Sequence, residues 1–193
     1  MAKVKSEVRP GWAKFCGWLL RRMGWKTIGG PMKEPKAIVL GVPHTTLLDF
    51  LVCYLFYTQF GKVAHIMVRK EFFKWPLGPI LRACGAVPVD TKSATGTVKS
   101  LIEQMESVPE FHLALAPEGT RKPVKRWKTG FHFIARKANI PVYLCYFDWG
   151  TRRIGNAGKV ELTDDAAADM KRIQQIYEDM HLTGRHPEKY ITH

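Results

Sequence analysis

The amino-acid sequence predicts an α/β fold, a layered sandwich in which helices flank a mixed, largely parallel central sheet, with an additional amphipathic helix at the N-terminus. Short apolar runs rich in β-branched residues alternate along the chain with longer segments of helical periodicity, the order typical of strands joined by crossover helices. With 193 residues and 46% hydrophobic side chains, the chain is long enough for one domain with a substantial core. We expect an amphipathic membrane-interface segment over 1–30 and a single folded domain over 31–193.

The first predicted helix carries aromatic residues interleaved with cations. Trp12, Phe15 and Leu19 recur at the spacing of one helical face. This composition suits a helix that lies in the lipid headgroup region, although a helix packed on the protein's own core would show the same spacing. The side chains that we expect to contact lipid are Trp12, Phe15, Trp18, Leu19, Arg22 and Trp25.

The rest of the chain gives a regular series of elements bounded by glycine, proline and polar residues. Strands are expected at 37–42, 62–68, 86–90, 111–116, 140–147 and 158–162. Helices are expected at 12–26, 47–60, 80–85, 130–139 and 164–182, with another from Thr95 or Thr97 to Pro109. Between them, residues 69–79 form an amphipathic connector whose aromatic side chains either face lipid or an acyl chain, or fold onto the core.

The formal net charge of +13 is concentrated in residues 1–36 and 119–137, whereas residues 161–193 are acidic on balance. Nucleic acid, a phosphate-bearing substrate and an anionic membrane would each satisfy such a charge. No nucleic-acid-binding signature is present, so no nucleic-acid partner is expected. The four cysteines are far apart and the histidines lack metal-ligand spacing, so no metal site is expected either.

After the strand over 37–42, His44 lies in a strand-to-helix turn, five residues before Asp49. Asp49 stands in an otherwise apolar helix, and a buried carboxylate needs a polar partner. If His44 remains on the incoming loop, its ring can fold back onto this carboxylate, which fixes the tautomer and leaves the second ring nitrogen as a proton acceptor. The backbone N–H groups after His44 are candidates to hold an oxyanion. The alternative is an ordinary loop histidine and an ordinary helix carboxylate.

A second strand, over 111–116, is followed at once by a turn of polar residues. Open α/β sheets place ligands just beyond the carboxyl ends of their strands. We therefore expect this turn to face the His44 loop and to form a site with it. The polar residues of the turn are Glu118, Gly119, Thr120 and Arg121.

These two sets of residues resemble the motifs of the glycerophospholipid acyltransferases, of the lysophosphatidic-acid acyltransferase type. The stretch from His44 to Asp49 is similar to the family's His-x4-Asp motif, and the stretch from Glu118 to Arg121 is similar to its Glu-Gly-Thr-Arg motif. Each motif alone is a weak signal, whereas both in this order, each at the end of a strand, are a strong one. Residues 87–90 and 140–142 look like the family's second and fourth motifs.

The resemblance implies transfer of a fatty acyl group from a thioester, acyl-CoA or acyl carrier protein, to the hydroxyl of a lysophospholipid or related lyso-lipid. The enzyme would be a 1-acylglycerol-3-phosphate O-acyltransferase-like acyltransferase, with residues 31–193 as its acyltransferase domain. His44 would deprotonate the acceptor hydroxyl, and Asp49 would orient the histidine. No cofactor is expected beyond the thioester co-substrate. The residues expected to bind the acceptor and its phosphate are Glu118, Gly119, Thr120 and Arg121.

Such an enzyme would act as a peripheral, monotopic protein on the cytoplasmic side of the membrane, since no window of the sequence is apolar enough to span a bilayer. Two positions depart from the family's pattern. Pro43 stands where the lysophosphatidic-acid enzymes usually carry asparagine, and Thr91 stands where their second motif carries a phosphate-binding arginine. The acceptor lipid, the acyl donor and the chain length therefore stay open.

Two other function classes compete with the acyltransferase interpretation. A non-catalytic basic module that binds anionic lipid or nucleic acid would explain the charge but not the motifs. A hydrolase would need a serine or cysteine nucleophile, yet no serine stands in a Gly-x-Ser-x-Gly elbow and no cysteine has an obvious activating neighbour.

Overall fold

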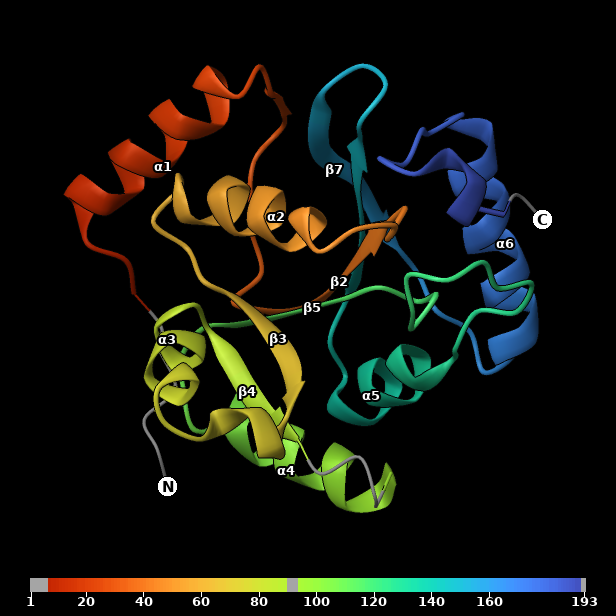
Figure 1. Ribbon diagram of the computed structural model, residues 1–193. Coiled ribbons are helices and arrows are strands. Elements are labelled where there is room, and N and C mark those ends of the chain that lie inside the picture. The colour runs from red at the N-terminus through yellow and green to blue at the C-terminus, as the bar shows by residue number, and fades with distance from the viewer. Residues whose placement is uncertain (1–6, 90–93, 192–193) are drawn as a thin grey trace.

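The computed structural model describes residues 7–89 and 94–191, which form a seven-stranded sheet with helices on both of its faces (Figure 1). The strand order is β1-β7-β6-β2-β5-β3-β4. The strands are β1 (Lys26–Ile28), β2 (Lys36–Val42), β3 (Ala64–Arg69), β4 (Ala86–Val89), β5 (Phe111–Leu115), β6 (Val142–Asp148) and β7 (Arg153–Val160). The helices are α1 (Pro10–Arg22), α2 (Leu48–Thr58), α3 (Leu77–Ala83), α4 (Ala94–Glu106), α5 (Gly130–Ala138) and α6 (Ala166–Asp179), with short 3-10 helices η1 (Lys70–Phe73) and η2 (Pro187–Lys189).

Most of the strands run in one direction. β6, β2, β5, β3 and β4 pair in parallel, whereas β7 pairs antiparallel with β6 and β1 pairs in parallel with β7. The reversal follows from the short turn 149–152 between β6 and β7, because parallel strands need a long crossover connection. The predicted mixed, largely parallel sheet flanked by helices is confirmed.

Two apolar cores lie on the two faces of the sheet. Ile38 and Leu40 of β2 face one core, and Ala37 and Val39 face the other, as the two-residue period of a strand requires. The first core packs the sheet against α4, α5 and α6, and the second packs it against α1 and α2. The central strands are buried on both sides, which fixes the loops at their carboxyl ends.

The predicted strands and helices are present with displaced ends, and the main differences lie at the β1 edge of the sheet. β1 is absent from the prediction because three residues carry no periodicity. β7 begins at Arg153 rather than at 158, since pairing with β6 outweighs the poor strand preference of its glycines. The helix predicted over 12–26 ends at Arg22, and Gly24 follows with φ of +81°. Residues 90–93, which include Thr91, lie outside the described residues.

α1 packs on α2 through its small residues rather than its aromatic ones. The buried residues of α1 are Ala13, Cys16, Gly17 and Leu20. Gly17 permits this close approach, because a Cβ there would lie 3.3 Å from Cβ of Gln59, which follows α2. The exposed aromatic residues of α1 are Trp12, Phe15 and Trp18. An aromatic face of α1 is therefore available to a partner outside the protein.

Two of the six residues expected to contact lipid lie away from this face. Trp25 is only 2% exposed and packs edge-on against Trp149, with ring centroids 4.9 Å apart. Its predicted lipid contact is wrong, because the chain leaves α1 at Met23 and turns inward toward β1. Leu19 is half-buried and packs against the core beneath α1 and α2. Of the helices in the described ranges, none is long and apolar enough to cross a bilayer.

Candidate active site

The polar residues singled out in the sequence gather beyond the carboxyl ends of three neighbouring central strands. β2 is flanked by β5 and β6 in the parallel part of the sheet. His44 follows β2, Glu118 follows β5, and Trp149 follows β6. Because all three strands end at the same edge, side chains more than seventy residues apart in sequence meet there.

His44 lies on the loop before α2 and its ring turns back toward Asp49. Nδ1 of His44 lies 3.3 Å from Oδ2 of Asp49. Asp49 is 1% exposed, whereas the His44 side chain is 26% exposed, so the pair joins a buried carboxylate to an accessible ring. The predicted contact between these two side chains is confirmed. The second ring nitrogen, Nε2, faces no partner within 7–89 and 94–191 and is available to a substrate.

Three hydrogen bonds hold the Asp49 carboxylate in place. The backbone N–H groups of Thr45 and Thr46 each donate to Oδ2 at 2.8 Å, and the indole N–H of Trp149 donates to Oδ1 at 2.8 Å. A buried carboxylate is stable only when such donors replace water. The two backbone groups are therefore already used, and the prediction that N–H groups after His44 hold an oxyanion is wrong for Thr45 and Thr46.

Glu118 connects the two motifs directly. Its Oε1 accepts a hydrogen bond of 2.9 Å from the backbone N–H of His44, so the predicted meeting of the two strand ends is confirmed. Glu118 is 6% exposed, and its Oε2 has no hydrogen-bond partner in the part of the chain that the structure describes. Burial raises the pKa of the Glu118 carboxyl to about 7, against the smaller opposing effect of the His44 N–H. Near neutral pH this carboxyl therefore exists in both protonation states.

The turn after Glu118 depends on its glycine. Gly119 has φ of +66°, and a Cβ there would lie 2.7 Å from Cδ and Cε of Lys128. Lys128 is held across the turn by a 2.8 Å hydrogen bond from its N–H to the carbonyl of Pro117. Thr120 accepts a hydrogen bond of 3.2 Å from the N–H of Lys122, which keeps the turn compact.

Arg121 lies on the exposed side of this turn, three residues after Glu118. Its guanidinium group forms no hydrogen bond or ion pair with any residue that the structure describes. The structure therefore joins His44, Asp49 and Glu118 through direct contacts, whereas Arg121 is an exposed cation with no such contact in the described part of the chain.

The sequence interpretation missed Trp149 and the segment after α6, which it treated as a polar tail. The carbonyl of Thr183 accepts from the N–H of Trp149 at 2.8 Å, and the N–H of His186 donates to Oγ1 of Thr45 at 3.3 Å. Between them, Gly184 lies so close to Thr45 that a Cβ would meet its Cγ2 at 2.6 Å. Trp149 follows the end of a strand just as His44 and Glu118 do. This position in the sequence could have marked it as a candidate site residue. The segment 183–186 carries no such signal.

Comparison with known proteins identifies the family. The family model described as Acyltransferase matches residues 27–148, well over half of the chain. The chain belongs to the Acyltransferase family. Its fold is similar to the crystal structure of the 1-acyl-sn-glycerophosphate (LPA) acyltransferase PlsC from Thermotoga maritima, with 18% sequence identity, a TM-score of 0.61, and coverage of 88% of this chain and 76% of that chain. A comparison with curated protein sequences finds no significant match.

The family match agrees with the resemblance to glycerophospholipid acyltransferases and covers both motifs. It ends at Asp148, so Trp149 and the segment 183–186 lie outside the matched region. In residues 7–89 and 94–191, no group of three His, Cys, Asp or Glu side chains is arranged to hold a metal ion. The residues that contact Thr45 and Asp49 thus lie partly inside the matched region and partly beyond it.

Proposed function

We propose that this acyltransferase moves a fatty acyl group from a thioester to the hydroxyl of a lysophospholipid or related lyso-lipid at a membrane surface. The observation that carries the proposal is the His44 ring, with Nδ1 beside Asp49 and Nε2 left accessible at the centre of the sheet edge. Nε2 takes the proton of the acceptor hydroxyl as its oxygen attacks the thioester carbonyl carbon. The C–S bond then breaks, and the imidazolium returns the proton to the departing thiolate.

Asp49 keeps the proton of the neutral ring on Nδ1 and stabilises the imidazolium that forms during the reaction. The carboxylate can do so only while it stays ionised and fixed. Its hydrogen bonds from Thr45, Thr46 and Trp149 serve that purpose.

The acceptor is proposed to lie between His44 and the turn that carries Glu118 and Arg121. The unpartnered Oε2 of Glu118 can bind a hydroxyl of the glycerol backbone. The exposed guanidinium of Arg121 suits a phosphate group, which it can bind through two parallel hydrogen bonds. Both acyl-CoA and acyl carrier protein remain suitable donors, and the choice between them is left to the assay.

We also propose a peripheral position on the cytoplasmic side of a membrane. The membrane contact is supported by two exposed apolar patches flanked by cations. The first is the aromatic face of α1, where Trp18 is 53% exposed beside Arg22. The second covers η1 and α3, where Trp75 is 88% exposed next to Lys74. Exposed tryptophans beside cations suit the headgroup region of a bilayer. The connector therefore faces outward at these positions, and folding of its aromatics onto the core is wrong for Trp75.

The membrane proposal is tested by cosedimentation with vesicles that contain anionic lipid. We expect Trp18→Ser and Trp75→Ser each to weaken binding. Phe133→Ser is the matched control, because Phe133 is an exposed aromatic residue on α5, where it contacts Lys137. Equal binding by all three variants and the unmodified protein would contradict the membrane proposal.

The acyl transfer itself is tested with radiolabelled acyl-CoA or acyl carrier protein thioester and a panel of lysophospholipids. We expect at least one acceptor to be acylated, and His44→Ala to lower kcat by about 10²- to 10⁴-fold, the usual contribution of a general base. His181→Asn is the control, since His181 is exposed with φ of 50°, a conformation that asparagine tolerates. Full activity in His44→Ala would remove His44 from the mechanism.

A further inference from the structure

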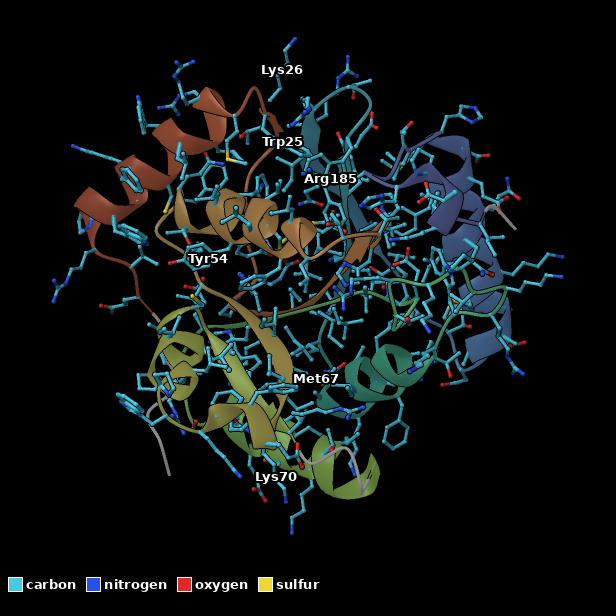
Figure 2. The ribbon with its side chains drawn as sticks, viewed as in Figure 1. Trp25, Lys26, Tyr54, Met67, Lys70 and Arg185 are labelled. Atoms are coloured by element: carbon cyan, nitrogen blue, oxygen red, sulfur yellow. The ribbon has the colours of Figure 1, made fainter. Side chains whose placement is uncertain are left out.

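Two arginines that the family motifs do not include lie over the same indole ring. The guanidinium carbon of Arg152 lies 5.3 Å from the ring centroid of Trp149, and that of Arg185 lies 5.0 Å from it. Arg152 also lies over Trp25, with its guanidinium carbon 5.9 Å from that ring centroid, and Trp25 itself packs against Trp149. Trp25 and Arg185 are labelled in Figure 2. Neither arginine forms an ion pair with an acidic side chain anywhere in residues 7–89 and 94–191, and both are exposed.

Backbone contacts fix both arginines in place. Arg152 lies in the turn between β6 and β7 with φ of 54°, and its carbonyl accepts a 2.7 Å hydrogen bond from the N–H of Lys26. Arg185 lies in the segment after α6, between residues that are anchored to Asp148 and to Thr45. The pair is therefore built by two separate parts of the chain, the turn 149–152 and the segment after α6, rather than by two side chains of one loop.

Asp148 ties these parts together. Its Oδ1 accepts a hydrogen bond of 3.0 Å from the N–H of Gly150 in the turn and one of 3.1 Å from the N–H of Thr183 in the C-terminal segment. Asp148 is buried, and its Oδ2 also accepts a hydrogen bond from the side-chain hydroxyl of Thr151. Its carboxylate therefore serves as an anchor, and the two guanidinium groups keep their charge open to solvent.

Two guanidinium groups beside one indole ring favour the binding of an anion near them. Each cation is stabilised by the face of the indole, but two positive charges over one ring repel each other. A phosphate group would offset this repulsion, and the planar guanidinium fork matches its oxygens. The indole N–H of Trp149 meanwhile donates to Asp49, so such a phosphate would lie next to the proposed catalytic pair.

We propose that Arg152 and Arg185, both stacked on Trp149, form a second anion subsite that binds a phosphate group of one of the two substrates. The inference rests on the proposed acyl transfer and deepens it. The phosphate is carried either by the headgroup of the lyso-lipid acceptor or by the coenzyme part of the acyl donor.

The test compares Arg185→Gln and Arg152→Gln with the unmodified enzyme, with Arg153→Gln as the matched control. Arg153 is the exposed neighbour of Arg152 and contacts neither tryptophan face. Two pairs of substrates are used: a lysophospholipid against a monoacylglycerol as acceptor, and acyl-CoA against an S-acyl pantetheine, which lacks phosphate, as donor. We expect KM for one phosphate-bearing substrate to rise about tenfold or more in both Gln variants. Arg185→Lys should recover part of the loss, because it keeps the charge without the planar fork.

The pattern of KM values identifies the source of the phosphate. A rise for the lysophospholipid but not for the monoacylglycerol assigns the subsite to the acceptor. A rise for acyl-CoA but not for the acyl pantetheine assigns it to the donor. Unchanged KM values for all four substrates overturn the inference. A fall in kcat alone also overturns it, since that result means that the arginines only hold Trp149 against Asp49.

Failure of the proposed acyl transfer can be distinguished from failure of the anion subsite. If the unmodified protein acylates no acceptor, the acyl transfer proposal fails and the subsite is tested by binding. Inorganic pyrophosphate, compared with chloride at equal ionic strength, should then raise the melting temperature of the unmodified protein and of Arg153→Gln more than that of Arg185→Gln. Equal shifts in all three proteins overturn the subsite.

Discussion

Two histidine–aspartate pairs within residues 7–89 and 94–191 differ in exposure, location and hydrogen-bond partners. His44 and Asp49 lie 3.3 Å apart at the carboxyl end of β2. His132 on α5 and Asp169 on α6 lie 3.0 Å apart, within the helix layer on one face of the sheet. The first ring is partly exposed, whereas the second is buried together with its carboxylate. Only the first can present a ring nitrogen to a substrate.

The two carboxylates also differ in their hydrogen-bond partners. Asp169 accepts hydrogen bonds from the N–H of Thr163 and from the guanidinium of Arg172 in addition to His132. Burial acts to raise the pKa of the Asp169 carboxyl, but these hydrogen bonds outweigh it and hold the pKa below its ordinary value. The pair thus joins α5, α6 and the segment before α6. A histidine beside an aspartate is a structural link where the ring is enclosed and a candidate base where it is open.

Replacing His132 should lower the stability of the protein without changing the rate of the catalysed reaction. In His132→Ala, Asp169 keeps its charge but loses one buried partner, so we expect the free energy of unfolding to fall by about 2–4 kcal/mol. The kcat of the protein that remains folded should be unchanged. Urea unfolding and acyl-transfer assays on the same samples measure both. A loss of kcat with full stability would mean that the two pairs have been assigned the wrong roles.

Glu118 offers a contrast with Asp169, because its pKa is raised and not lowered. The carboxyl titrates near 7 in the folded protein and at 4.5 in the reference state. The folded state therefore binds this proton more tightly, so the contribution of Glu118 to stability is greatest below pH 4.5 and falls as the pH rises toward 7. Glu118→Gln removes this pH-dependent loss of stability. We therefore expect the free energy of unfolding of the variant, relative to that of the unmodified protein, to be about 2–3 kcal/mol higher at pH 8 than at pH 5. Urea unfolding at both values tests this. The exposed Glu188→Gln is the control, and equal pH dependence in all three proteins would contradict the raised pKa.

Trp149 donates a hydrogen bond to Asp49, just as Arg172 donates one to Asp169. Removal of the Trp149 donor should therefore lower the activity of the catalytic pair. Trp149→Phe keeps an aromatic ring but deletes the donor to Oδ1 of Asp49. We expect kcat to fall about tenfold, the usual scale for a group that orients a catalytic side chain. Arg172→Gln is the matched control at the other pair, and it should lower stability without changing kcat. An unchanged kcat in Trp149→Phe would show that the backbone donors alone hold the carboxylate.

Much of the fold follows from the sequence, because the central strands are apolar on both faces and the helices between them have clear periodicity. The same patterns place His44 and Glu118 at strand ends, which is enough to predict that they meet. The edge strand β1 and its neighbour β7 resist prediction. β1 is too short to show a periodicity, and Gly155 and Gly158 weaken the strand signal of β7, so that pairing with β6 decides the structure there.

The site was predicted less completely than the fold. Sequence reasoning finds the residues whose types suggest chemistry, but it cannot show which donors a carboxylate has already engaged. Thr45 and Thr46 therefore looked available for an oxyanion although both bind Asp49. Residues 183–186 reach the site only through tertiary contacts such as the hydrogen bond from His186 to Thr45. Trp25 was misassigned because its burial depends on where α1 ends.

The central claim is that His44 and Asp49 act as one unit, and a double-mutant cycle on kcat/KM tests it most directly. We expect Asp49→Asn to lose most of the activity that His44→Ala loses, since the wrong tautomer would leave no proton acceptor at Nε2. The double variant should lose no more than His44→Ala alone, because residues that act together have strongly non-additive effects. Losses that simply add, or an Asp49→Asn variant with normal kcat/KM, would contradict this account.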